Sequence, residues 1–121
     1  MKIFISHSTG FDYKKELYEP IKSHFENSDI EFIYPEDAGI NSFNVIKSCD
    51  AFIAEVSFPS TGSGIEIGWA NSFGKPVHCL HKANCKPSGA LKLVTSNIYA
   101  YKETEELISI LNKIIKKNNM E

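Results

Sequence analysis

Cross-linking and metal-binding residues are scarce in this sequence. It contains 3 cysteines among 121 residues, none of them in a Cys-x-x-Cys pair, so neither a disulfide framework nor a structural zinc site is indicated. Cys49 and Cys79 lie in apolar contexts and are expected in the core. The four histidines follow no metal-ligand spacing. We therefore expect no metal site in this protein.

Excess charge and long apolar runs are absent as well. With a formal net charge of -2, the chain has no electrostatic means of binding a nucleic acid polymer. No apolar run approaches the roughly 20 residues of a membrane span, and the chain opens on a strand-like run rather than a signal peptide. We expect a cytoplasmic protein that binds neither nucleic acid nor membrane, built as a single domain over residues 1–121.

The most informative part of the sequence lies in its middle. A short apolar segment, 51–54, has the length of a buried strand. It is followed by a polar stretch with two glycines, and then by a segment, 65–73, whose apolar residues recur at helical spacing. This order predicts a strand, a glycine-rich turn and a helix.

The turn carries residues suited to an anion. Gly62 and Gly64 would allow positive φ and the close approach of a ligand, while backbone N–H groups and the helix dipole would face its charge. Ser60 offers a hydroxyl, and Glu66 is expected in the first helical turn, directed to the side of the turn where the anion would bind. The spacing Ser-x-Gly-x-Gly-x-Glu thus combines phosphate donors with one carboxylate. The alternative is a plain loop in which Glu66 only complements the helix dipole.

Strands and helices alternate along the rest of the chain. We expect strands at 2–6, 30–34, 77–81 and 98–101, and helices at 13–25, 41–48 and 90–94 and from residue 104 onward. Pro20 should kink or split the first helix, and Gly74 should end the central one. The alternation predicts an α/β fold, a flavodoxin/Rossmann-like three-layer sandwich around a five-stranded, mostly parallel sheet. In such folds the ligand binds beyond the carboxyl ends of the strands, which gathers the polar loops 7–12, 35–39 and 60–66 around one crevice.

The central segment resembles a known family. Similarity to the nucleoside 2-deoxyribosyltransferases lies in Asp-Ala-Phe-Ile-Ala-Glu-Val-Ser at 50–57, Pro-Ser-Thr-Gly-Ser-Gly-Ile-Glu-Ile-Gly at 59–68 and Gly-Lys-Pro-Val at 74–77. These pieces look closest to the branch that contains the 2′-deoxynucleoside 5′-monophosphate N-hydrolases. The resemblance implies cleavage or transfer of an N-glycosidic bond in a small nucleoside or nucleotide, without a cofactor. It also implies a homodimer, with Trp69 and Phe73 near its interface.

The resemblance also implies roles for individual residues. Glu66 matches the family's nucleophile, which attacks the anomeric carbon of the sugar. Ser60 matches a serine of the monophosphate-binding group, and Gly62 and Gly64 match the glycines that line the phosphate. The first loop, which surrounds the sugar and base in the family, here contains Ser6, His7, Ser8 and Gly10.

The chain departs from the family pattern at three places. A tyrosine that assists the nucleophile aligns with Ile3 or Phe4, neither of which has a hydroxyl. An aspartate that contacts the base or leaving group aligns near Ser42. A serine from a neighbouring subunit aligns near Ala90, with Ser88 as a substitute if the loop shifts. The candidates for the supporting acid are His7, Asp12, Glu36 and Asp37.

Two other functions fit parts of the sequence. Residues 3–8 look like the opening strand of TIR domains, some of which hydrolyse NAD with a glutamate on a helix. A chain that kept the phosphate-binding turn but lost turnover would instead be a non-catalytic nucleotide-binding or signalling module. Release of free base from deoxynucleotides, release of nicotinamide from NAD, or binding without release would separate the three.

Overall fold

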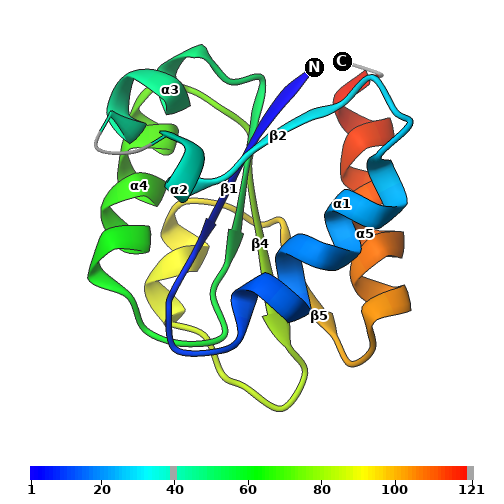
Figure 1. The fold of residues 1–121 in the computed structure, drawn as a ribbon. Coiled ribbons are helices and arrows are strands. Elements are labelled where there is room, and N and C mark those ends of the chain that lie inside the picture. The colour runs from blue at the N-terminus through cyan, green and yellow to red at the C-terminus, as the bar shows by residue number, and fades with distance from the viewer. Residues whose placement is uncertain (39–40, 120–121) are drawn as a thin grey trace.

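Five parallel strands form the middle layer of the molecule (Figure 1). The computed structural model describes residues 1–38 and 41–119. The strands are β1 (Lys2–His7), β2 (Glu31–Ile33), β3 (Ala51–Glu55), β4 (Val77–Lys82) and β5 (Ile98–Tyr101). They lie in the order β2-β1-β3-β4-β5, and every pairing is parallel. The predicted α/β fold with a five-stranded sheet is therefore confirmed, with β3 at its centre.

Helices cover both faces of this sheet (Figure 1). One face carries η1 (Lys14–Tyr18), α1 (Glu19–Phe25) and α5 (Thr104–Asn119). The other carries α3 (Ser42–Ser48), α4 (Thr61–Ser72) and η2 (Gly89–Leu93), with the short α2 (Pro35–Ala38) beside α3. Within residues 1–38 and 41–119, no helix has the length and apolar character needed to cross a membrane.

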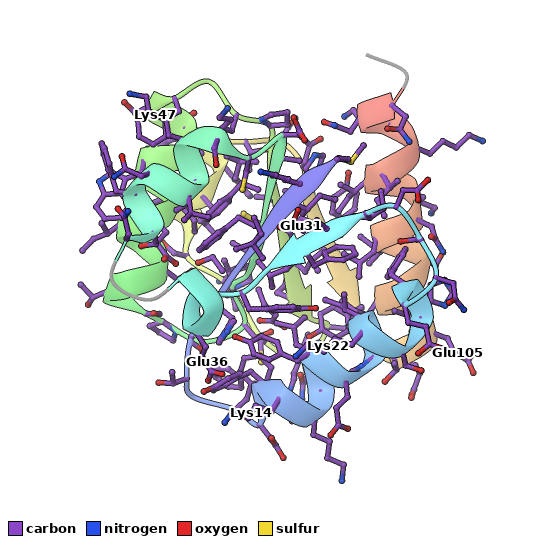
Figure 2. All side chains as sticks on the ribbon, turned by 45° about the horizontal axis from the view of Figure 1, so that its top comes forward. Lys14, Lys22, Glu31, Glu36, Lys47 and Glu105 are labelled. Carbon is purple, nitrogen blue, oxygen red and sulfur yellow. The ribbon has the colours of Figure 1, made fainter. Side chains whose placement is uncertain are left out.

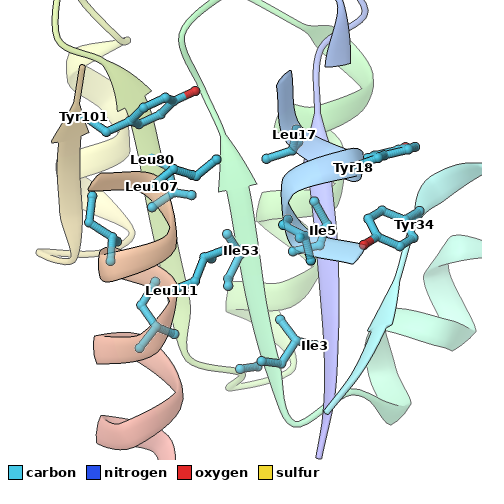
Figure 3. Packing of buried hydrophobic residues seen from close by; sticks show 14 residues of the cluster. Ile3, Ile5, Leu17, Tyr18, Tyr34, Ile53, Leu80, Tyr101, Leu107 and Leu111 are labelled. Carbon is cyan, nitrogen blue, oxygen red and sulfur yellow. The ribbon is translucent and has the colours of Figure 1, made fainter. Parts of the chain in front are cut away.

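Two apolar clusters hold the layers together, one on each face of the sheet. All five residues of β3 are buried, as expected for a central parallel strand covered from both sides. Towards α3 and α4, Phe52 stacks on Phe4 of β1 with ring centroids 5.7 Å apart. Towards α5, Ile53 packs in the cluster that contains Leu107 and Leu111 (Figure 3). Alternate residues of β3 thus face opposite layers.

Proline and glycine shape two helix ends as predicted. Pro20 splits the first helix: the turn before it is π-helical, and the N–H of Glu19 donates to the carbonyl of Lys14, five residues back. A widened turn accommodates a proline because its ring has no N–H and would clash with the carbonyl four residues earlier. Gly74 ends the central helix with φ of 72°. The N–H of Lys75 then donates to the carbonyl of Ala70 at 3.0 Å, which satisfies the helix end.

Two predictions about the loops are wrong. The stretch after β2 does not stay a loop, because Pro35 opens the short helix α2, a position that suits its fixed φ. Residue 39, the last of that predicted loop, lies outside the described residues. Helix α4 begins at Thr61 instead of residue 65, so Gly62 and Gly64 are helical. Among the described residues only Gly74 has positive φ, and the predicted left-handed turn at the other two glycines does not form.

The early start of α4 has a local cause. Ser60 is its N-cap, and the Ser60 Oγ accepts a hydrogen bond from the N–H of Ser63 at 3.2 Å. A capping serine stabilises a helix by about 1 kcal/mol, which is comparable to the cost of one glycine in a helix. Glu66 consequently lies in the second turn of α4, not in the first as predicted. A Cβ added at Gly62 or Gly64 would meet no atom within 4 Å, so both glycines border open space.

Candidate active site

The polar loops meet where the chain leaves neighbouring strands toward opposite faces. β1 and β3 are adjacent, but β1 continues into η1 on one face and β3 into α4 on the other. Such a point at the carboxyl edge of a parallel sheet is the usual ligand site of this architecture. The loop after β1 also reaches α2, because Tyr13 Oη donates to Glu36 Oε1 at 2.9 Å. Lys14 Nζ lies 3.9 Å from the same oxygen, and Figure 2 labels both Lys14 and Glu36.

A chain of hydroxyl groups holds Glu66 at this edge. Ser6, fully buried in β1, donates from its Oγ to Glu66 Oε1 at 2.8 Å. Ser63 Oγ lies 2.8 Å from Ser6 Oγ. Because the single proton of Ser6 goes to the carboxylate, Ser63 is the donor in that second bond. Ser6 therefore supplies the hydroxyl that neither Ile3 nor Phe4 offers, a contact between positions 60 residues apart that the sequence pattern did not indicate.

The surroundings of Glu66 change its acidity in both directions. Burial raises the pKa of the Glu66 carboxyl above its ordinary value, because desolvation disfavours the charged form. Hydrogen bonding from Ser6 and Ser42 and the nearby His7 act in the opposite direction and do not cancel the effect of burial. Ser42, the first residue of α3, stands near the position where the family's aspartate was expected. The result is a half-buried carboxylate with hydroxyl partners.

His7 is engaged on both ring nitrogens. Its Nδ1 lies 2.7 Å from the carbonyl oxygen of Ser8, which can only accept, so Nδ1 carries a proton. In the neutral ring Nε2 then accepts from Tyr18 Oη at 2.5 Å. The ring also stacks on Tyr13, with centroids 4.3 Å apart. His7 thus belongs to an aromatic group with Tyr13 and Phe11, and it lies near enough to Glu66 to influence the acidity of that carboxyl.

The other predicted loop residues have mainly internal contacts. Ser8 is buried, and its Oγ accepts from the N–H of Gly10 at 3.3 Å. A Cβ at Gly10 would lie 3.4 Å from the Cβ of Phe58, so the two loops pack against each other at this point. Of the acid candidates, Asp12 accepts from the N–H of Lys15 at 3.4 Å, and Glu36 has the partners given above. The side chain of Asp37 lies outside the described residues.

A cavity of about 530 Å³ opens on the other side of the α4 N-terminus, towards η2. Its polar lining consists of Ser57, Ser60, Ser63, Lys86 and Ser88, and Gly64 also lines it. Because Ser60 Oγ accepts from Ser63, its own proton is free to be donated. The N–H groups of Thr61 and Gly62, in the first helical turn, have no carbonyl of α4 to bind. This cavity therefore offers an anion several donors, and its lining adds the positive charge of Lys86, which the sequence pattern did not single out.

Ser63 connects the cavity with the carboxylate. Its side chain lines the cavity, while its hydroxyl bonds to Ser6, which in turn bonds to Glu66. The predicted site residues Ser60, Gly64 and Glu66 are thus brought together around the first two turns of α4. In the described part of the chain, no group of three or more histidine, cysteine, aspartate or glutamate side chains is placed to hold a metal ion. Cys49 and Cys79 are buried as predicted.

Comparison with known proteins gives one match in sequence among curated proteins. No family model matches the chain. The chain is 36% identical over 76 residues to 5-hydroxymethyl-dUMP N-hydrolase from Rattus norvegicus. The match covers 58% of this chain and 44% of the rat protein, so it spans less than half of that relative.

Two solved structures match the fold over most of the chain, and a third matches about two thirds of it. A CMP N-glycosidase from Clostridium botulinum superimposes with a TM-score of 0.70 and 28% identity, covering 93% of this chain and 99% of that one. A 2-deoxyribosyltransferase from Bacillus psychrosaccharolyticus gives a TM-score of 0.66 at 13% identity, with 88% and 90% covered. The corresponding enzyme from Leishmania mexicana gives 0.55 at 22% identity, with 66% and 63% covered. The last two similarities concern the fold alone. In sequence and fold together the chain is similar to the nucleoside 2-deoxyribosyltransferase-like enzymes.

Proposed function

We propose that this protein cleaves or transfers the N-glycosidic bond of a (deoxy)nucleoside or its 5′-monophosphate, with Glu66 as the nucleophile. The observation that carries the proposal is the position of the Glu66 carboxylate, joined through Ser6 and Ser63 to a cavity rich in anion donors. A sugar above Glu66 would place its phosphate near the α4 N-terminus. The names of the rat N-hydrolase and the clostridial N-glycosidase describe the same bond cleavage in nucleotides.

The proposed reaction needs two events at the sugar. As the C1′–N bond breaks, its electron pair leaves with the base and C1′ gains positive charge. Glu66 forms a bond to C1′, which gives a glycosyl-enzyme ester and resembles the step used by retaining glycosidases. Water or a second base then attacks C1′ and frees the carboxylate. The aromatic rings of His7 and Tyr13 offer a surface on which the base can stack.

The alternatives are distinguished by one assay. The purified protein is incubated with deoxynucleosides, their 5′-monophosphates, CMP and NAD, and free base is followed by chromatography. Base release from nucleosides or nucleotides is the expected result. Nicotinamide release from NAD would favour the TIR-like reaction, and binding without any release would favour a non-catalytic module. Either of those two outcomes contradicts the proposal.

The hydrogen bond from Ser6 should set the pH range of activity. The Ser6 hydroxyl stabilises ionised Glu66, so Ser6→Ala raises the pKa of that carboxyl further above its ordinary value. Because the nucleophile must be ionised, the decline of kcat/KM on the acid side should move to higher pH. The pH–rate profiles of Ser6→Ala and wild type measure this shift. Ser72→Ala, at the exposed end of α4, is the matched control, and equal profiles for Ser6→Ala and wild type would contradict the proposed role of Ser6.

We also propose that the protein is a homodimer that uses the exposed side of α3 and α4. Phe43 is 42% exposed and Ile65 is 49% exposed. Phe43 packs edge-on against Trp69 and Phe73, with ring centroids 5.2 and 5.1 Å apart, so the two predicted interface residues lie next to an exposed apolar surface. Light scattering at micromolar concentration should give a molecular mass of twice the 13.6 kDa of one chain. The substitution Ile65→Lys should lower this mass toward that of the monomer. A monomeric wild type would overturn this assembly.

A further inference from the structure

A second buried carboxylate lies at the carboxyl edge, and the proposed reaction does not use it. Glu55 is the last residue of β3 and is 1% exposed. Ala54 belongs to the cluster that faces α4, whereas Ile53 belongs to the cluster that faces α5. Because side chains alternate along a strand, Glu55 points to the α5 face. Glu66, on α4, lies on the opposite side of the sheet.

Three donors surround this carboxylate. Glu55 Oε1 accepts from the N–H of Ser57 at 2.7 Å, and Oε2 accepts from Ser57 Oγ at 2.9 Å. The hydroxyl of Tyr101, in β5, donates to the same Oε2. Figure 3 shows the Tyr101 side chain reaching from β5 toward the end of β3. Burial and the contact with Glu55 raise the pKa of Tyr101 well above its ordinary range, so the phenol keeps its proton and remains a donor.

Ser57 carries these contacts to the end of a third strand. Its Oγ accepts from the N–H of Lys82, the last residue of β4, at 2.7 Å. We call Glu55, Ser57, Tyr101 and the Lys82 N–H the Glu55 cluster. It ties the ends of β3, β4 and β5 to one carboxylate, whose full set of donors offsets the cost of its burial. Burying an ion without partners costs several kcal/mol. Breaking any of these contacts is therefore unfavourable, and the cluster holds the ends of the three strands in place.

The chain that follows Ser57 leads directly to Ser60 and the N-terminus of α4. Ser57 is three residues before Ser60, the N-cap of α4, and both residues line the cavity at the α4 N-terminus. Between them, Phe58 packs against Phe11, with ring centroids 5.8 Å apart. Residues 56–60, the β3–α4 segment, are thus held from the α5 face by the Glu55 cluster.

We propose that the Glu55 cluster positions the β3–α4 segment for phosphate binding, and that Tyr101 is a specificity-determining residue for the phosphate group. This inference rests on the proposed function for the place of the phosphate. The cluster contacts the segment that precedes Ser60 but neither Ser6 nor Glu66. Its loss should therefore weaken recognition of the phosphate and leave the chemistry at the sugar unchanged.

Tyr101→Phe tests this division because it removes one donor and keeps the ring. We expect about tenfold weaker binding of ribose 5-phosphate by calorimetry, and a similar rise of KM for a nucleoside 5′-monophosphate. The value of kcat and the KM for the corresponding nucleoside should not change. Tyr99→Phe, two residues earlier in β5, removes a hydroxyl outside the Glu55 cluster and should behave as wild type. A general loss of stability would instead affect both substrates alike.

A double mutant separates positioning from direct contact. If Tyr101 acts through Ser60, Tyr101→Phe should add little to the loss of ribose 5-phosphate affinity already caused by Ser60→Ala. Full additivity, or wild-type affinity in Tyr101→Phe, would overturn the inference. Should Tyr101→Phe not fold, hydrogen exchange in the wild type decides instead. Ribose 5-phosphate should slow exchange at the Ser57 and Lys82 amides, and unchanged exchange would count against the proposal.

The binding assay also keeps this inference apart from the proposed function. Ribose 5-phosphate has no base, so its binding can be measured in a protein that cleaves nothing. If wild type binds it but releases no base from any nucleotide, the glycosidase proposal fails and the test of Tyr101 still stands. If wild type does not bind it, the phosphate site and the role of Tyr101 both fail.

Discussion

Glu66→Gln is expected to reduce the rate of base release by several orders of magnitude while the protein stays folded. The amide keeps the volume of the side chain and an oxygen that can accept from Ser6. It carries no negative charge to stabilise the developing positive charge at C1′, and it does not form the ester. Rates of base release under saturating nucleotide, together with thermal unfolding of both proteins, measure the two parts of this expectation.

Glu105→Gln is the matched control for the loss of a glutamate. Glu105 lies in the first turn of α5, where a carboxylate complements the helix dipole, and Figure 2 labels it at the surface. Its replacement should cost about 0.3–1 kcal/mol of stability and leave activity unchanged. If Glu66→Gln behaved in the same way, Glu66 would only complement its own helix. An active Glu66→Gln protein would remove the nucleophile and with it the proposed mechanism.

A nucleoside 5′-monophosphate should bind at least about 100-fold more tightly than its nucleoside. Hydrogen bonds to a charged group contribute roughly 1.5–3 kcal/mol each, and two of them correspond to a factor of about 100 or more in Kd. Ser60 and Lys86 line the cavity, and the first N–H groups of α4 follow Ser60 directly in the chain. Calorimetry at fixed salt compares the two ligands. Equal affinities would contradict the placement of the phosphate.

Gly64 provides a sharper form of the same test. Gly64→Ala should stabilise α4 by up to about 1 kcal/mol, because alanine favours a helix and a Cβ there meets no atom within 4 Å. The same Cβ enters the cavity and should weaken binding of the monophosphate more than that of the nucleoside. Asn71→Ala, near the end of α4 and outside the cavity lining, is the matched control for helix propensity. A stabilised Gly64→Ala protein with full affinity would place the phosphate elsewhere.

The order of the elements was readable from local patterns. The apolar run 51–54 became the buried centre of the sheet, because a strand covered on both faces has no polar positions to alternate with. Pro20 and Gly74 acted as predicted, since a missing N–H and a positive φ are properties of single residues. The spacing of Ser60 and Glu66 likewise indicated a helix end with a carboxylate near it. These features depend on neighbours within a few positions.

The contacts that make a site came only from the tertiary structure. Ser6 meets Glu66 across 60 positions, and Tyr101 meets Glu55 across 46. No periodicity marks such pairs, because each depends on strand order and on which face a side chain takes. Even the start of α4 depended on a cap at Ser60 that offsets part of the cost of two glycines in the helix. The sequence by itself determined the five strands and most of the helices in their order along the chain. The packing of parallel strands decided which hydroxyl groups face each carboxylate, because their carboxyl ends converge on one edge.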